Sequence, residues 1–142
     1  MSTVLLIDDD PEFLDAFEAI LSRAGYQVLR AGDGTEGIRM LRELGEEISL
    51  AVIDLSLPEV NGFEIIGAIT RRPNNVKMLV TTAVFRDSQL EVASALGAHA
   101  VLRKPPRGSP LPAVEWLGTV RKLIGVPRPT TTGEGRRAQN SR

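Results

Sequence analysis

Leu50-Ala51-Val52-Ile53-Asp54 is a short, continuous apolar run that ends in a single carboxylate. Other runs of the same kind also lead into polar residues: Val4-Leu5-Leu6-Ile7 into Asp8-Asp9-Asp10, Met78-Leu79-Val80 into Thr81-Thr82, and a fourth that ends at Lys104-Pro105. Short apolar runs that alternate with helical patterns are typical of buried parallel strands. The sequence therefore predicts an α/β fold in which charged and hydroxyl side chains follow the strands.

The elements alternate strand and helix five times. The predicted strands are Val4–Ile7, Tyr26–Arg30, Leu50–Asp54, Val76–Thr81 and Ala98–Leu102. The predicted helices begin near Pro11, Thr35, Asn61, Asp87 and Pro110–Pro112. Asp10 is a plausible N-cap for the first of them, and Gly37 inside the second should cost up to about 1 kcal/mol relative to Ala. This order requires a parallel sheet covered by helices on both faces.

Composition excludes several function classes. The chain has 142 residues, a formal net charge of -1 and no cysteine. The length predicts one domain. The near-neutral charge predicts no basic surface for nucleic acid, and the absence of cysteine excludes disulfides and thiolate metal sites. The first apolar run is too short for a signal peptide, and no run is long enough to span a membrane, so the default compartment is the cytoplasm.

The final segment, 126–142, differs in character from the rest. It is rich in Pro, Thr, Gly and Arg, and only Val126 and Ala138 are apolar. Such a segment buries too little surface to offset its ordering entropy. We therefore expect a domain over residues 1–125 and a disordered tail over 126–142, either simply solvated or used for docking or localisation.

The strand ends predict a phosphoryl site. In an open α/β sheet the ligand crevice lies beyond the carboxyl ends of the strands. A carboxylate there, such as Asp54, can act as a nucleophile and form an acyl phosphate. Because two anions repel, a cation has to stand between them, and Mg²⁺ is usually held by one or two carboxylates. Asp8 and Asp9 are placed to supply those carboxylates, and the backbone carbonyl of Ser56 a further oxygen.

Two more polar residues complete the predicted site. Lys104 would pair with a phosphoryl oxygen as a point charge, and the Thr82 hydroxyl would donate to another. Taken singly, each residue has a plainer interpretation: Asp10 as a helix cap, Asp54 as the start of a turn, Lys104-Pro105 as a common dipeptide. Their joint position after successive apolar strands favours the functional interpretation.

With these motifs the chain resembles the receiver domain of two-component response regulators. The resemblance covers about residues 3–124 and is carried by Val4–Asp10, Asp54–Pro58 with Asn61–Glu64, Val80–Ala83, and Gly97-Ala98 with Leu102–Pro105. It implies a doubly wound, five-stranded parallel sheet of flavodoxin-like order 2-1-3-4-5. It also implies Mg²⁺-dependent phosphotransfer to Asp54 from a phosphohistidine on a sensor histidine kinase or histidine phosphotransfer protein, with Asp8 and Asp9 as metal ligands, Thr82 as switch hydroxyl and Lys104 as phosphate-binding lysine.

The chain departs from the family in two places. The family usually carries Tyr or Phe three residues before the lysine, and here that residue is Val101, which has no ring to turn inward. The face formed by the helix near 87–96, the strand Ala98–Leu102 and the last helix is therefore a weaker candidate for an aromatic switch, although it remains a possible homodimer surface. The segment Pro106–Pro110 is also longer than the usual turn.

The sequence leaves several functions open. The leading hypothesis is a stand-alone signalling phosphoacceptor, not an enzyme beyond its own phosphorylation and dephosphorylation, with output through a partner, self-association or phosphorelay. The alternative is an interaction module that signals without phosphate, and Asp54→Asn would separate the two. A haloacid-dehalogenase-type phosphatase is disfavoured because Ser56 stands where that chemistry needs a second Asp.

Two single residues have their own interpretations. Trp116 is interpreted either as a partly buried core residue or as an anchor in a partner or dimer interface, and His99 as a surface residue.

Overall fold

A computed structural model describes residues 2–55, 62–71, 75–83, 91 and 93–127 of the chain. Its strands are all parallel and form one five-stranded sheet in the order β2-β1-β3-β4-β5. The predicted fold class and strand order are thus confirmed. In chain order the elements are β1 (Thr3–Ile7), α1 (Pro11–Arg23), β2 (Gln27–Ala31), α2 (Gly34–Leu44), β3 (Ile48–Asp54), α3 (Gly62–Thr70), β4 (Lys77–Thr82), β5 (Ala100–Arg103) and α5 (Ala113–Ile124).

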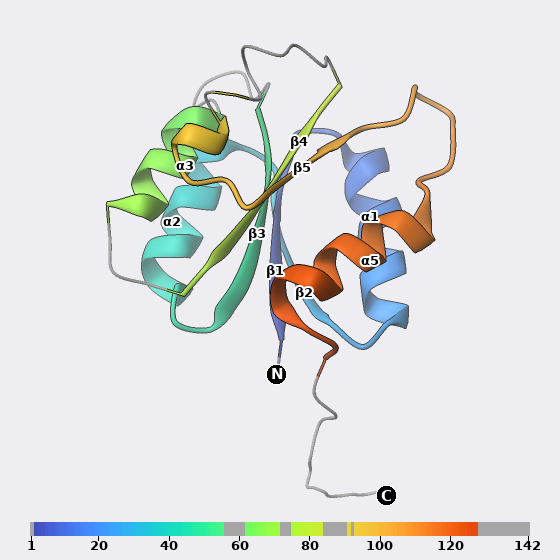
Figure 1. Cartoon of the computed structure of the whole chain (residues 1–142), viewed down its shortest axis with the longest axis horizontal. Helices are drawn as coiled ribbons and strands as arrows, with labels where there is room; N and C mark the ends of the chain where they lie inside the picture. The colour runs from blue at the N-terminus through green and yellow to red at the C-terminus, as the bar shows by residue number, and fades with distance from the viewer. Residues whose placement is uncertain (1, 56–61, 72–74, 84–90, 92, 128–142) are drawn as a thin grey trace, which may run out of the picture.

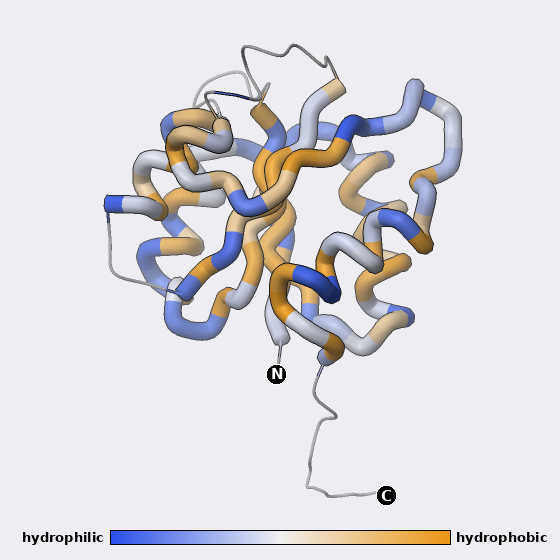
Figure 2. The backbone as a smooth tube through the Cα atoms, in the orientation of Figure 1, coloured by the Kyte–Doolittle hydropathy of each residue, from blue (hydrophilic) through white to orange (hydrophobic). Residues whose placement is uncertain are grey.

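Helices cover both faces of the sheet. Figure 1 shows α2 and α3 on one face and α1 and α5 on the other, with the carboxyl ends of the strands at the top of the view. Each face has its own apolar core, and the central strands β1, β3 and β4 contribute side chains to both cores. Figure 2 shows the apolar colouring gathered along these strands. Because they are buried on both faces, they carry apolar side chains at successive positions, which explains the continuous apolar runs in the sequence.

Pairing between strands moves several predicted boundaries by one or two residues. β3 begins at Ile48 instead of Leu50, because Ile48 is paired with Thr3 across a register shift. β4 extends to Thr82, which is paired with Arg103 at the end of β5. The helix start predicted near Asn61, most of the helix predicted from Asp87 and the tail from 128 onward lie outside the described residues.

A glycine sets the spacing between α2 and β1. A Cβ on Gly37 would lie 2.8 Å from Ile7 side-chain atoms, closer than packed atoms normally approach. The glycine that weakens the isolated helix therefore allows it to pack against the last residue of β1, directly before Asp8.

The far end of α5 is tied to the opposite edge of the sheet. The Tyr26 hydroxyl donates a 2.6 Å hydrogen bond to the carbonyl of Gly125, just beyond the helix. Figure 1 places this end of α5 at the bottom of the view, beside the start of β1. Within the described residues, no helix combines the length and apolarity needed to cross a membrane.

Candidate functional site

Three carboxylates converge where β1 and β3 end. Parallel pairing sets Ile7 opposite Ile53, so Asp8 and Asp54 emerge side by side at the same edge. Both are buried, at 1% and 5% exposure, whereas the neighbouring Asp9 is exposed. One carboxylate oxygen from each of Asp8, Asp9 and Asp54 lies within 4.8 Å of the others. The structure thus brings together the three acids that the sequence singled out.

The turn after β1 separates the roles of the consecutive aspartates. Oδ1 of Asp8 accepts the backbone N–H of Asp10 at 2.9 Å, which fixes the turn. Oδ1 of Asp10 accepts the N–H of Glu12 at 3.1 Å and caps α1, and Pro11 occupies the first turn. Asp10 is therefore the helix cap that the sequence indicated, and Asp8 remains directed to the site.

Lys104 supplies the positive charge. Its Nζ lies 2.6 Å from Oδ2 of Asp8 and 3.5 Å from Oδ2 of Asp54, and its side chain is only 12% exposed. Its backbone N–H donates to the carbonyl of Thr82 at 2.8 Å, which anchors the residue after β5 to the end of β4. The predicted convergence of this lysine with the acids is therefore present in the structure.

Thr82 ends β4 and is 1% exposed. Its neighbour Thr81 is paired with Asp54, and the N–H of Leu55 donates to the carbonyl of Thr81 at 3.1 Å. The backbone of β4 therefore runs beside the carboxylate of β3. Val101, paired with Val80 on β5, is partly buried against the core on the α2–α3 face. Ser56, the predicted source of a carbonyl ligand, lies outside the described residues.

The electrostatics of the site suit an added cation. The pKa of the Asp8 carboxyl is raised to about 6, mainly by burial and also by the Asp54 charge, while Lys104 and the Asp10 N–H lower it. Oδ2 of Asp8 is buried and makes no hydrogen bond of good geometry among the described residues, although Lys104 pairs with it by charge. A buried carboxylate oxygen with spare lone pairs beside two further acids is a donor set that fits a hard divalent ion.

Two residues near the site were not identified from the sequence. The Lys104 ammonium lies 4.5 Å from the ring centroid of Phe13, a buried residue of α1. A Cβ on Gly62 would lie 2.6 Å from the backbone carbonyl oxygen of Asp54, so α3 starts directly against the backbone of Asp54. No local pattern signals either contact, because both depend on how distant segments pack.

The tryptophan and the histidine that the sequence singled out do not belong to the acidic site. Trp116 is 1% exposed and packs edge-on against Phe17, so the interface-anchor interpretation is wrong and the core interpretation holds. His99 is exposed, as expected, and its Nδ1 accepts the backbone N–H of Met78 at 3.0 Å. Neither residue joins the site.

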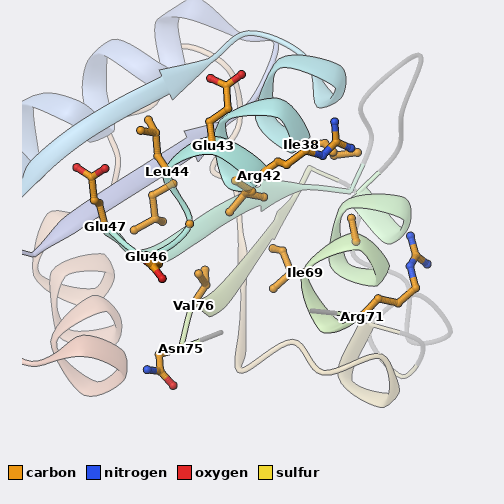
Figure 3. Close-up of a pocket in the computed structure, with 14 residues that line it drawn as sticks. Ile38, Arg42, Glu43, Leu44, Glu46, Glu47, Ile69, Arg71, Asn75 and Val76 are labelled. Carbon is orange, nitrogen blue, oxygen red and sulfur yellow. The ribbon is translucent and has the colours of Figure 1, made fainter. Parts of the chain in front are cut away.

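A separate hollow of about 810 Å³ lies between α2 and α3, at the opposite edge of the sheet (Figure 3). Its lining mixes apolar residues such as Leu41 and Ile69 with Arg42, Glu43 and Arg71. The described lining includes no aspartate, threonine or lysine. The acidic edge therefore offers the more specific chemistry for a functional site.

Comparisons with known proteins match most of the chain to one family. The family described as "response regulator receiver domain" matches residues 4–113. The transcriptional regulatory protein AfsQ1 of Streptomyces coelicolor is 35% identical over 113 residues, which cover 80% of this chain and 49% of that protein. The response regulator GtcR of Aneurinibacillus migulanus is 31% identical over 112 residues, covering 79% and 44%. The chain thus spans about half the length of these curated relatives.

Solved structures agree with this match. A CheY-like response regulator receiver domain protein from Methanospirillum hungatei superposes with a TM-score of 0.77 at 26% identity, covering 87% of this chain and 94% of that one. A response regulator receiver domain protein from Clostridium thermocellum gives 0.78 at 25% identity, with the same coverage.

Proposed function

The chain belongs to the family of response regulator receiver domains of two-component signalling, and from this premise we propose that it accepts a phosphoryl group on Asp54. The observation that carries the proposal is the joint placement of Asp8, Asp54 and Lys104 at the carboxyl edge of the sheet. A buried carboxylate flanked by a second acid and an ammonium has a nucleophile and a counter-charge for a phosphoryl oxygen.

The reaction is a transfer between two phosphoryl carriers. A carboxylate oxygen of Asp54 attacks the phosphorus of a phosphohistidine on a partner protein. A P–O bond forms as the P–N bond breaks, and the departing imidazole takes up a proton. Lys104 holds one phosphoryl oxygen as a point charge, and the Thr82 hydroxyl donates to another. The product is an aspartyl phosphate whose new contacts distinguish the modified state from the unmodified one.

The site residues fit a magnesium ion. Asp8, Asp9 and Asp54 would hold it, together with the backbone carbonyl of Ser56. When bound, Mg²⁺ neutralises the repulsion between the carboxylates and the incoming phosphoryl oxygens. Asp8 and Asp9 serve to keep that charge beside Asp54, and Lys104 balances the remaining negative charge.

The partners follow from this chemistry. A sensor histidine kinase or histidine phosphotransfer protein would donate the phosphoryl group, in the cytoplasm, to a receiver domain that extends over residues 1–125. The change at Asp54 would then pass to a protein target, to a further phosphorelay step or to a second copy through the face to which β5 and α5 contribute. Val101 on β5 has no aromatic ring that could gate that face, so the signal would travel by other contacts.

Asp54→Asn tests the phosphoacceptor directly. Incubation of the wild-type protein with Mg²⁺ and a small acyl phosphate is expected to add one phosphoryl group, detected by intact mass. Asp54→Asn should add none while keeping the wild-type circular dichroism spectrum, because the amide is a poor nucleophile of nearly the same shape. Asp10→Asn is the matched control, since Asn also caps helices and the residue lies outside the three-acid cluster.

Full labelling of Asp54→Asn would refute the assignment. Absence of labelling in the wild type, combined with unchanged partner binding by Asp54→Asn, would favour a phosphate-independent interaction module.

A further inference from the structure

Lys104 has a second neighbour besides the acids. Its ammonium lies 4.5 Å from the centroid of the Phe13 ring, within the range of a cation–π interaction. The side chain of Lys104 is 12% exposed and Phe13 is 6% exposed, so little water intervenes to screen the contact. The ammonium thus lies between carboxylates on one side and an aromatic face on the other.

The two kinds of neighbour behave differently when a cation enters the site. The shortest ion-pair distance of Lys104 is to Oδ2 of Asp8, at 2.6 Å, and this buried oxygen has spare lone pairs for a metal ion. A metal ion would compete with the ammonium for that oxygen. The Phe13 ring has no lone pair to give to a metal ion, so its attraction for the ammonium persists when Asp8 is engaged.

We propose that Phe13 is a positioning residue for Lys104, whose ring holds the ammonium beside Asp54 when Asp8 turns to the metal ion. The proposal rests on the proposed phosphoacceptor function and assigns Phe13 no contact with the phosphoryl group itself. It places a residue that affects phosphoryl binding on α1, a helix that carries none of the three site acids Asp8, Asp9 and Asp54.

The packing around Phe13 gives the ring a fixed orientation. Its centroid lies 5.8 Å from that of Phe17 and 5.6 Å from that of Trp116, and Phe17 packs on Trp116 at 5.1 Å and 88°. These three rings, Phe13, Phe17 and Trp116, form an aromatic cluster between α1 and α5. A ring held from behind by two others presents a constant face to the lysine, as a positioning role requires.

Lysine NMR tests the contact itself. The chain has three lysines, Lys77, Lys104 and Lys122, so ¹³C-lysine labelling yields three ε-methylene signals, which Lys104→Arg assigns. The Lys104 signal is expected to lie upfield of the other two because of the ring current of Phe13. Phe13→Leu should abolish that upfield shift and Phe13→Tyr should retain it. A Lys104 signal that coincides with the others in the wild-type protein would overturn the proposal.

Affinity for beryllofluoride in the presence of Mg²⁺, measured by calorimetry, tests the consequence. Phe13→Leu is expected to bind more weakly, because without the ring the ammonium that Asp8 releases has no second attraction beside Asp54. The loss can reach at most the value of a desolvated cation–π contact, about thirtyfold, and Phe13→Tyr should restore the affinity. Leu21→Val is the matched control, because it removes buried apolar surface from the same helix and Leu21 lies outside the aromatic cluster. Urea unfolding shows which variants are folded. If Phe13→Leu does not fold, the comparison of Phe13→Tyr with the wild type keeps the test usable.

The outcomes separate the two proposals. Wild-type affinity in Phe13→Leu, or an equal loss in Leu21→Val, would show that Phe13 only packs, and would leave the phosphoacceptor function standing. A wild-type protein that binds no beryllofluoride and accepts no phosphoryl group would instead refute the proposed function, whereas the lysine signal would still report on the ring contact.

Discussion

Gly62 shows how one residue without a side chain can shape the site. A Cβ at this position would lie 2.6 Å from the carbonyl oxygen of Asp54 and 2.7 Å from Cα of Leu55, both of them backbone atoms. The backbone cannot yield as the end of a flexible side chain can. Only glycine therefore lets α3 begin this close to the proposed phosphoacceptor.

Gly62→Ala is accordingly expected to destabilise the protein by about 1–3 kcal/mol and to slow labelling by an acyl phosphate, because the strand end bearing Asp54 has to shift. Urea unfolding and the labelling rate measure the two effects. Gly67→Ala, in the same helix, is the control: its Cβ would meet only the end of the Arg71 side chain, at 3.2 Å. That variant should be neutral or stabilised by up to about 1 kcal/mol. Equal stability and rates for the two variants would contradict this account.

The residues that the sequence could identify are those whose position follows from strand ends. Asp8, Asp54 and Lys104 each follow a short apolar strand, and parallel topology then brings them to one edge. The contacts of Phe13 and Gly62 with the site could not be predicted, because they depend on packing between segments that are distant in the sequence. Helical periodicity places Phe13 in the core but does not reveal which charge lies over its ring.

At the scale of elements, a side-chain hydrogen bond ties the far end of α5 to the residue before β2. Tyr26, which follows the turn after α1 and directly precedes β2, is 3% exposed and donates a hydrogen bond from its hydroxyl to the carbonyl of Gly125 at 2.6 Å. Burial raises the pKa of this hydroxyl above its ordinary value, against a smaller lowering by Arg121. The hydroxyl therefore stays protonated at neutral pH, and the bond persists there.

Tyr26→Phe should lower the free energy of unfolding by about 0.5–1.5 kcal/mol, the usual net value of one hydrogen bond. The loss is expected to be local. Hydrogen exchange at the Gly125 amide, which donates to Arg121 at 2.8 Å, should accelerate, while amides of β3 in the centre of the sheet should follow only the change in global stability. Unchanged exchange at Gly125 would mean that packing alone holds the end of α5.

Element boundaries were predicted less well than element identity, for a physical reason. Apolar runs report which residues are buried, whereas strand ends depend on pairing with the neighbouring strand. Ile48 joins β3 through its pairing with Thr3, and Thr82 joins β4 through its pairing with Arg103. Those partners lie far away in the sequence, so hydropathy alone could not set the boundaries.

For the whole molecule, the three acids concentrate negative charge that the unfolded chain would disperse. Asp8, Asp9 and Asp54 bring oxygens within 4.8 Å of one another, and Lys104 offsets only part of that charge. A divalent ion that binds this folded arrangement and not the unfolded chain stabilises the fold by mass action.

Mg²⁺ at about one hundred times its Kd should therefore add about 2.7 kcal/mol to the free energy of unfolding and raise Tm by several degrees, as thermal melts with Mg²⁺ and with EDTA would show. Asp9→Asn should lose most of the gain. Asp33→Asn is the control, because Asp33 caps α2 through the N–H of Glu36 and lies outside the three-acid cluster. A wild-type Tm that does not respond to Mg²⁺ would remove the metal from the proposal.

The aromatic cluster also equips the protein with an optical probe of its own. Trp116 is the only tryptophan in the chain, so all indole fluorescence comes from one buried position. Its ring lies 5.6 Å from that of Phe13, whose face carries the Lys104 ammonium. A charge that moves near Phe13 alters the field at the fluorophore, and therefore its emission. Stopped-flow experiments can thus follow events at the acidic edge in real time on the unlabelled wild-type chain.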